Sequence, residues 1–167
     1  MLKTVDRQVL GLERQIAKLI ESDDRSGIGR LPRDEFGHVD KLLRSVPGVG
    51  PVLSSALLAG LMELGTIARR QAGALVGVAP FNCDSGRFKG KRRIRGGRAS
   101  VRSVLYMATL AAMRFNPVIR RFAERLRRAA KLKMVIVVAC MRKLLSIINA
   151  MIREGMTWDQ LTLVKNA

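Results

Sequence analysis

Aromatic side chains and cysteines are scarce in this chain of 167 residues, which contains five Phe, one Tyr, one Trp and two Cys. Proteins that bind single-stranded nucleic acid without sequence preference stack its bases on aromatic rings, so the shortage of rings disfavours that class. Cys83 and Cys140 lie far apart in the sequence and have no His close by. This spacing provides neither a disulfide framework nor a metal site.

Acidic residues are scarce after residue 40. Residues 41–167 contain 24 Lys or Arg but only five Asp or Glu, whereas residues 1–40 contain seven Lys or Arg and eight Asp or Glu. The net charge of +18 therefore lies in the second part of the chain. This balance favours nucleic acid as a partner, with an anionic membrane surface as the second choice. Because the five later acids are scattered, we expect no metal or cofactor site in this chain.

Uninterrupted apolar runs are short. The longest run in the C-terminal part, Met134–Met141, has eight residues, whereas a helix that spans a bilayer needs about 20. The first residues contain no apolar core of a secretory signal. We therefore expect a cytoplasmic protein with no membrane partner. A basic membrane-surface protein is also disfavoured, because the charge lies in a glycine-rich segment rather than along one amphipathic helix.

Helical periodicity dominates the chain and predicts a mainly α fold with two parts. Residues 1–38 combine an amphipathic connector helix, which either packs on its own domain or forms a coiled-coil dimer, with a Gly- and Pro-containing loop over 22–38. Residues 39–167 form a helical domain. Its helices are predicted over 39–46, 52–64, 69–77, 99–115, 118–133 after Pro117, 132–153 and 158–164.

The sequence Pro47-Gly48-Val49-Gly50-Pro51 predicts a tight hairpin between two helices. Gly48 and Gly50 permit positive φ, and Pro51 suits the first turn of a helix. Backbone N–H groups beside a helix N-terminus bind anions. The pattern is typical of the helix-hairpin-helix motif, which binds a nucleic-acid backbone without reading its sequence. An ordinary turn between two helices is the alternative.

The segment from Cys83 to Arg102, CDSGRFKGKRRIRGGRASVR, concentrates the positive charge. Its basic residues are Arg87, Lys89, Lys91, Arg92, Arg93, Arg95, Arg98 and Arg102, against the single acid Asp84. Glycines at positions 86, 90, 96 and 97 leave the backbone open enough for close approach to a partner. We expect a loop or a short hairpin over residues 80–98, and we expect these basic residues, with Gly48 and Gly50, to bind a phosphate backbone.

One hydroxyl, Ser85, stands just before this charge. Nucleophilic catalysis needs a hydroxyl beside an activating group, and Arg87 and Lys89 lie close enough in sequence to neutralise a phosphate under attack. Nearby cations also favour the alkoxide. From these residues alone, an ordinary Ser-Gly turn explains Ser85 better than catalysis does. Tyr106, a second hydroxyl that could join to DNA, lies in an apolar helix, where core packing explains it.

Three stretches, in order, resemble one known family: LLRSVPGVGPVLSSALLAGL, then LVGVAPFNCDSGRFKGKRRIRGGRASVRSVLYMATLAAMRFNPVIRRFAERL, then KMVIVVACMRKLLSIINAMI. They resemble the C-terminal domain of the insertion-sequence transposases that pair a RuvC-like (DEDD-type) domain with a serine-bearing domain, the bridge-RNA-guided DNA recombinases. The resemblance covers roughly residues 40–155. Residues 1–38 resemble the helical connector that precedes that domain.

This resemblance implies the C-terminal portion of a DNA transposase or recombinase, with Ser85 as the nucleophile that forms a 5′-phosphoserine link to DNA. The acidic RuvC-like domain, which would hold Mg²⁺ in a composite site assembled across subunits, is missing from these residues, so we expect no strand cleavage by this chain alone. DNA is the implied partner, together with a guide (bridge) RNA and a homo-oligomer of the full-length enzyme. The alternative is a non-catalytic helix-hairpin-helix module that binds DNA or RNA, in which Ser85 is dispensable.

Overall fold

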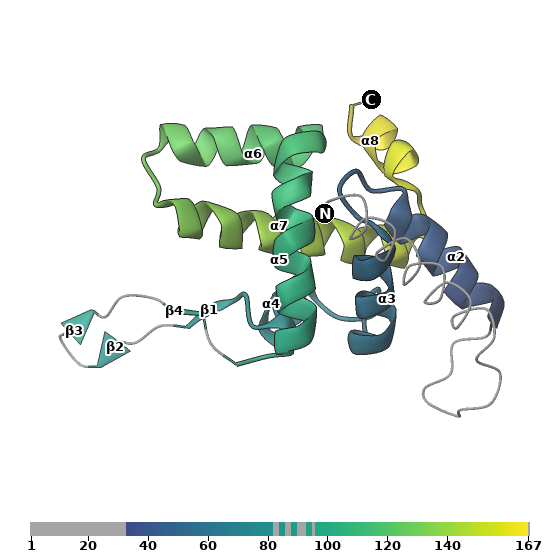
Figure 1. Ribbon diagram of the computed structural model, residues 1–167, viewed down its shortest axis with the longest axis horizontal. Helices are drawn as coiled ribbons and strands as arrows, with labels where there is room; N and C mark the ends of the chain where they lie inside the picture. The colour runs from purple at the N-terminus through teal and green to yellow at the C-terminus, as the bar shows by residue number, and fades with distance from the viewer. Residues whose placement is uncertain (1–32, 82–83, 86–87, 90–92, 95, 167) are drawn as a thin grey trace, which may run out of the picture.

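The computed structural model describes residues 33–81, 84–85, 88–89, 93–94 and 96–166 (Figure 1). The predicted connector helix and most of the predicted loop over 22–38 lie outside these ranges. The described elements follow in the order α2 (Arg33–Arg44), α3 (Pro51–Gly60), α4 (Arg69–Val76), β1 (Pro80–Phe81), β2 (Asp84–Ser85), β3 (Phe88–Lys89), β4 (Arg93–Ile94), α5 (Ala99–Phe115), α6 (Pro117–Arg128), α7 (Lys133–Glu154) and α8 (Trp158–Asn166). The prediction of a mainly α fold is confirmed.

Helix α7 is the centre of the helical core, and α2, α4, α5 and α6 pack against it (Figure 1). Its inward face includes Leu144 and Ile148, both with no exposed surface, beside the buried thiol of Cys140. By length and composition α7 is apolar enough to cross a membrane, but more than half of its most apolar window is buried inside the protein. Such burial is typical of the core helix of a helical domain.

A buried amide fixes the turn between α3 and α4 to this central helix. The Asn149 side chain of α7 donates from Nδ2 to the Ile67 carbonyl at 3.0 Å, and its Oδ1 accepts from the Gly65 N–H at 2.8 Å. Both contacts bridge more than 80 residues of sequence. Because a buried amide is costly unless it is hydrogen-bonded, this pairing specifies how the turn sits on α7.

Three helix ends differ from the predictions by four residues or more. Helix α6 ends at Arg128, before the predicted end at 133. Helix α2 begins at Arg33, inside the predicted loop, and continues through the glycine at 37. Helix α3 ends at Gly60, although the apolar pattern continues to residue 64. A Cβ at Gly60 would lie 2.5 Å from the Val101 side chain of α5, so the glycine permits close packing of these helices where α3 ends.

The predicted hairpin between α2 and α3 packs against the junction of α5 and α6. Gly48 adopts the positive φ that a glycine permits, at 96°, whereas Gly50 is extended with φ of −100°. A Cβ at Gly48 would lie 2.6 Å from the Ala112 backbone of α5. The Asn116 side chain caps α6 by accepting from two backbone N–H groups and donates to the Pro47 carbonyl at 3.4 Å. Gly48 therefore has a packing role within the fold.

We predict that Gly48→Ala lowers the free energy of unfolding by about 2 kcal/mol, because the methyl group would enter the α5 backbone at a residue with positive φ. The matched variant is Gly50→Ala, where φ is negative, the residue is exposed and no atom lies within 4 Å of the added Cβ. It should change stability by less than about 0.5 kcal/mol. Urea unfolding of both variants measures the difference. Equal effects at the two glycines would refute the packing role of Gly48.

Candidate nucleic-acid interface

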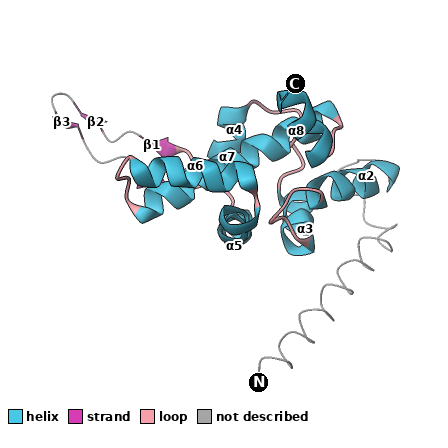
Figure 2. Cartoon of the chain, turned by 90° about the horizontal axis from the view of Figure 1, so that it is seen from above, coloured by secondary structure: helices cyan, strands magenta, loops and turns pink. Residues whose placement is uncertain are grey.

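The basic segment forms an arm that projects from the helical body (Figures 1 and 2). Strand β1 pairs antiparallel with β4, and β2 pairs antiparallel with β3. Figure 1 shows β2 and β3 at the far end of this arm, with β1 and β4 nearer to α4 and α5. The sequence is compatible with either a loop or a short hairpin, and the described strands pair as a hairpin.

Ser85 lies on β2 near the far end of the arm. Its Cα partner is Phe88 on β3, and Asp84 pairs with Lys89. The two residues between Ser85 and Phe88 lie outside the described residues. The backbone thus carries Ser85 away from the helical core. Tyr106, the other hydroxyl considered above, is partly buried against that core, as predicted.

The structure describes only two of the six basic residues of the arm. Lys89 lies on β3 and Arg93 on β4, and their backbones are described. The other predicted phosphate ligands of the arm, Arg87, Lys91, Arg92 and Arg95, lie outside the described residues. Binding of nucleic acid by these six residues, and by Gly48 and Gly50 in the helical hairpin, stays a prediction.

We call the place where the chain leaves α4 for the arm and returns from it into α5 the root of the arm. Arg98 joins three helices there. Its guanidinium donates to both carboxylate oxygens of Glu63, at 2.6 and 2.7 Å, and to the Gly60 carbonyl at 2.9 Å. Its backbone N–H donates to the Leu75 carbonyl at 2.8 Å, and the residue is the N-cap of α5. Arg98, predicted as a phosphate ligand, therefore connects the end of α3, the end of α4 and the start of α5.

Arg102 and three glycines close the root. The Arg102 guanidinium donates to the carbonyl groups of Val76 and Gly96. Gly77, before the arm, and Gly97, after it, both have positive φ, and a Cβ at Gly97 would lie 2.6 Å from the Gly77 Cα. We expected the glycines of this segment to admit an external partner. At Gly97 the close approach is instead to the chain's own backbone, because the two ends of the arm meet there.

The charge of Arg98 at the root is paired within the chain by Glu63. The hydrogen bond from Arg98 is the largest effect on the pKa of Glu63. Together with a hydrogen bond from the Glu63 backbone, it lowers that pKa to about 2. The same hydrogen bond raises the pKa of Arg98. Glu63 is thus an ionised partner of an arginine, and no group of three or more His, Cys, Asp or Glu among the described residues could hold a metal ion.

The buried Cys140 is not an accessible nucleophile. Burial raises the pKa of its thiol to about 11, and the positive charge of Arg127 offsets only part of that effect. A thiol with this pKa is neutral near pH 7, and the thiolate is the reactive form. Cys83, the other cysteine, lies outside the described residues.

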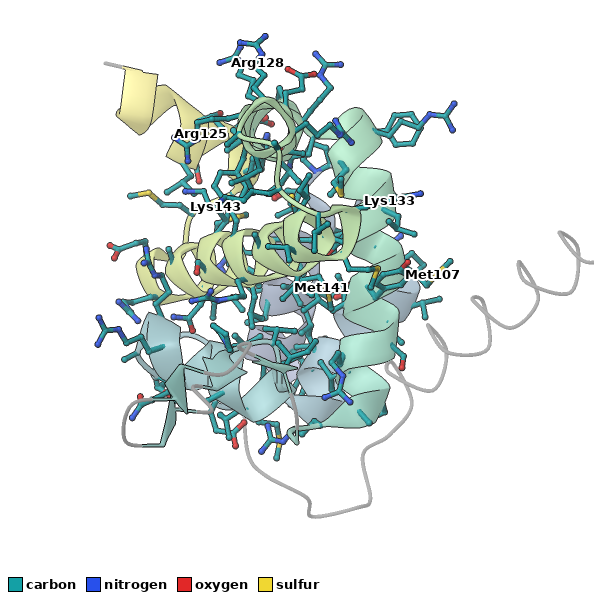
Figure 3. All side chains as sticks on the ribbon, turned by 90° about the vertical axis from the view of Figure 1, so that its left-hand side faces the viewer. Met107, Arg125, Arg128, Lys133, Met141 and Lys143 are labelled. Atoms are coloured by element: carbon teal, nitrogen blue, oxygen red, sulfur yellow. The ribbon has the colours of Figure 1, made fainter. Side chains whose placement is uncertain are left out.

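A second basic surface lies on α6 and was not included among the predicted ligands. Its exposed cations are Arg120, Arg121, Arg125, Arg127 and Arg128, and Lys131 and Lys133 follow in the turn to α7. Figure 3 shows Arg125 and Arg128 on the outer side of α6 and Lys133 at the start of α7. The turn from α6 to α7 and the arm extend toward the same side of the molecule (Figures 1 and 2). The run of arginines in residues 118–133 is the sequence signal that indicates this basic face.

We predict a pH-dependent loss of stability in Glu63→Gln. Because the pKa of Glu63 is lower in the folded chain than its ordinary value of 4.5, the ion pair stabilises fully above about pH 4.5 and progressively less as the pH falls toward 2. Both side chains are more than a third exposed, so solvent screening limits the effect near pH 7 to about 1 kcal/mol or less.

Urea unfolding of the wild type and Glu63→Gln at pH 7 and pH 3 measures this effect. Glu154→Gln, which replaces an exposed carboxylate at the end of α7, is the matched control. The difference between wild type and Glu63→Gln should be smaller at pH 3 than at pH 7. A difference that stays constant or grows on acidification would contradict the ion pair as its source.

The arm, its root, α5 and most of α6 lie within the part of the chain that matches a known family. Residues 40–124, just over half of the chain, match the family described as Transposase IS116/IS110/IS902 family. The chain is 30% identical over 130 residues to a pilin gene-inverting protein of Moraxella bovis, covering 75% of this chain and 40% of that protein. It is 33% identical over 127 residues to an uncharacterized 42 kDa protein of insertion element IS900 from Mycobacterium paratuberculosis, covering 73% of this chain and 31% of that protein.

A third relative matches along nearly the whole chain. The chain is 27% identical over 161 residues to an uncharacterized 43.6 kDa protein of insertion element IS110 from Streptomyces coelicolor, covering 95% of this chain and 36% of that protein. The chain thus spans between about a third and two fifths of the length of these relatives. On the match over residues 40–124, the chain belongs to the IS116/IS110/IS902 family of transposases.

Proposed function

We propose that this chain supplies the DNA-binding and strand-joining portion of a transposase or recombinase, and that its arm brings cations and Ser85 to a phosphodiester. The observation that carries this proposal is the arm itself. Between its root glycines, Gly77 and Gly96, the sequence contains six Lys or Arg and a single acid, Asp84. The root arginines Arg98 and Arg102 are held by partners within the chain, so they can position the arm.

Duplex DNA is the partner that fits these charges best. A polyanion with regularly spaced phosphates suits both the arm cations and the exposed arginines of α6. Two relatives are named pilin gene-inverting proteins, and inversion of a gene is a rearrangement of DNA. A guide (bridge) RNA, a homo-oligomer and a cytoplasmic location are proposals that rest on the family resemblance alone.

The helical hairpin between α2 and α3 adds a candidate backbone contact. Gly50 is exposed and precedes Pro51 at the start of α3, where helix N–H groups are available to an anion. Gly48 packs on α5, so Gly50 is the better placed of the two for a helix-hairpin-helix contact. The non-catalytic alternative uses this contact and the arm cations for binding and leaves Ser85 without a role.

In the proposed chemistry the Ser85 Oγ attacks the phosphorus of a DNA phosphodiester. The Oγ–P bond forms while the P–O3′ bond breaks, the serine proton passes to solvent, and the 3′ oxygen leaves and takes up a proton. The product is a 5′-phosphoserine link, and attack by a 3′-hydroxyl of another strand reverses these steps and releases the serine. Arm cations would stabilise the charge that develops on the phosphate. No group of three or more His, Cys, Asp or Glu among the described residues could hold a metal ion. The family resemblance implies that Mg²⁺ would be held by the RuvC-like domain.

We predict that Ser85→Ala abolishes covalent linkage to DNA but leaves DNA affinity within about twofold, because the substitution removes the nucleophile without removing a cation. The assay uses a full-length transposase that carries this sequence as its C-terminal portion. It measures protein–DNA adducts that survive denaturing gels, recombinant product, and the dissociation constant for duplex DNA. Ser103→Ala, which replaces an exposed serine of α5, is the matched control and should retain all three.

If Ser85→Ala forms the DNA adduct and the recombinant product at the wild-type level, Ser85 is not the nucleophile. That result would favour the non-catalytic binding module. Loss of both products in Ser103→Ala as well would also count against Ser85, because the loss would then not be specific to that hydroxyl.

A further inference from the structure

The turn between α6 and α7 carries apolar side chains that the core does not use. We call residues 127–135 the α6–α7 corner. Leu132, Met134 and Val135 are 77%, 59% and 51% exposed, whereas the next residue of α7, Ile136, is buried. Isolated exposed apolar residues are ordinary, but here three lie within four positions of the chain, and we call them the apolar patch.

The backbone of the corner is tightly constrained. Helix α6 ends with hydrogen bonds from the Ala130 N–H to the Arg127 carbonyl at 2.9 Å and from the Lys131 N–H to the Leu126 carbonyl at 3.2 Å. Ala130 adopts a φ of 50°, a conformation that usually requires glycine. A non-glycine residue held in this region is strained, and such strain is frequent at functional sites. The corner therefore presents its side chains in a defined direction.

Positive charge surrounds the apolar patch. Arg127, Arg128, Lys131 and Lys133 are all exposed, and the sequence contains no acid between Arg125 and Arg153. Figure 3 views the corner nearly end-on and shows Arg128 and Lys133 from α6 and α7, respectively. A second copy of this chain would bring the same cations face to face, so like-charge repulsion opposes self-association through this patch. The partner must be anionic and must also offer apolar surface.

Duplex DNA meets both requirements. Its phosphates suit the four cations, and its base pairs offer apolar faces once a base step opens. Proteins that bend DNA insert Leu, Met or other apolar side chains between base steps from the minor groove, and the resulting bend lets the duplex contact more protein surface. The corner and the arm face the same side of the molecule, so a bent duplex could contact both.

We propose, relying on the DNA-binding function proposed above, that the α6–α7 corner is an apolar wedge. Leu132 and Met134 enter the minor groove and partly unstack one base step, while Arg127, Arg128, Lys131 and Lys133 contact the flanking phosphates. The wedge kinks the duplex toward its major groove. It acts on DNA shape and so adds a role separate from the strand-joining chemistry of Ser85.

The test uses the full chain with a duplex of about 30 base pairs that carries a fluorescent dye at each end and 2-aminopurine at successive positions. Three quantities are measured: the end-to-end distance by energy transfer, base unstacking by 2-aminopurine fluorescence, and the dissociation constant. The wedge variant is Leu132→Ser combined with Met134→Ser. Met62→Ser, which replaces a 45% exposed side chain after α3, is the matched control, and thermal unfolding checks that every variant is folded.

The wild type and Met62→Ser should bend the duplex and raise 2-aminopurine fluorescence at one step. The wedge variant should lose both signals and bind DNA about tenfold more weakly. Bending and unstacking by the wedge variant at the wild-type level, or DNA binding by the wild type without either signal, would overturn the wedge and leave the DNA-binding function intact. No duplex binding by the wild type at 0.1 M salt would overturn both.

Two further results would replace the wedge with another partner for this patch. In one, the wedge variant binds and bends DNA normally but loses self-association in analytical ultracentrifugation. In the other, it loses binding to vesicles that contain anionic lipid while its effects on DNA are unchanged. Either result would show that the α6–α7 corner does not act on DNA.

Discussion

The contact between the two ends of the arm is the constraint on which the rest of the candidate interface depends. Gly77 and Gly97 bring their backbones together in a way that no side chain would permit, and Arg98 and Arg102 hold that junction by hydrogen bonds to carbonyl groups and to Glu63. Because Arg98 is also the N-cap of α5, the direction of the arm and the start of a core helix are fixed together. A two-stranded hairpin has little stability of its own, so this junction determines where the basic residues lie.

The helical body provides the support for that junction. Helix α7 buries one face against four other helices, and Asn149 attaches the turn that carries Glu63 toward the root. The hairpin at Gly48 packs on α5 and α6, so the candidate anion site at the start of α3 is rigidly connected to the same helices. The arm, the α6 surface and the helical hairpin thus belong to one framework.

Much of the helical fold could be predicted from the sequence because each helix has a strong local signal. The small and apolar residues from 99 to 115 and the proline at 117 mark α5 and the start of α6 at the observed positions. The close packing of Gly60, at the end of α3, on Val101 could not be predicted, because Val101 belongs to a helix distant in sequence. The structural roles of Arg98 and Gly97 were missed for the same reason: their partners lie 35 and 20 residues away, and charge and glycine content also fit an external phosphate.

The most direct test of this account is the salt dependence of duplex binding by the full chain in two variants, Arg92→Ala in the arm and Arg102→Ala at the root. A cation that contacts phosphate contributes about −0.9 to the slope of log binding constant against log salt concentration. Arg92→Ala should make the slope less negative by about this amount. Arg102→Ala should lower the free energy of unfolding and leave the slope unchanged. A changed slope for Arg102→Ala together with an unchanged slope for Arg92→Ala would contradict the division between structural root and DNA-binding arm.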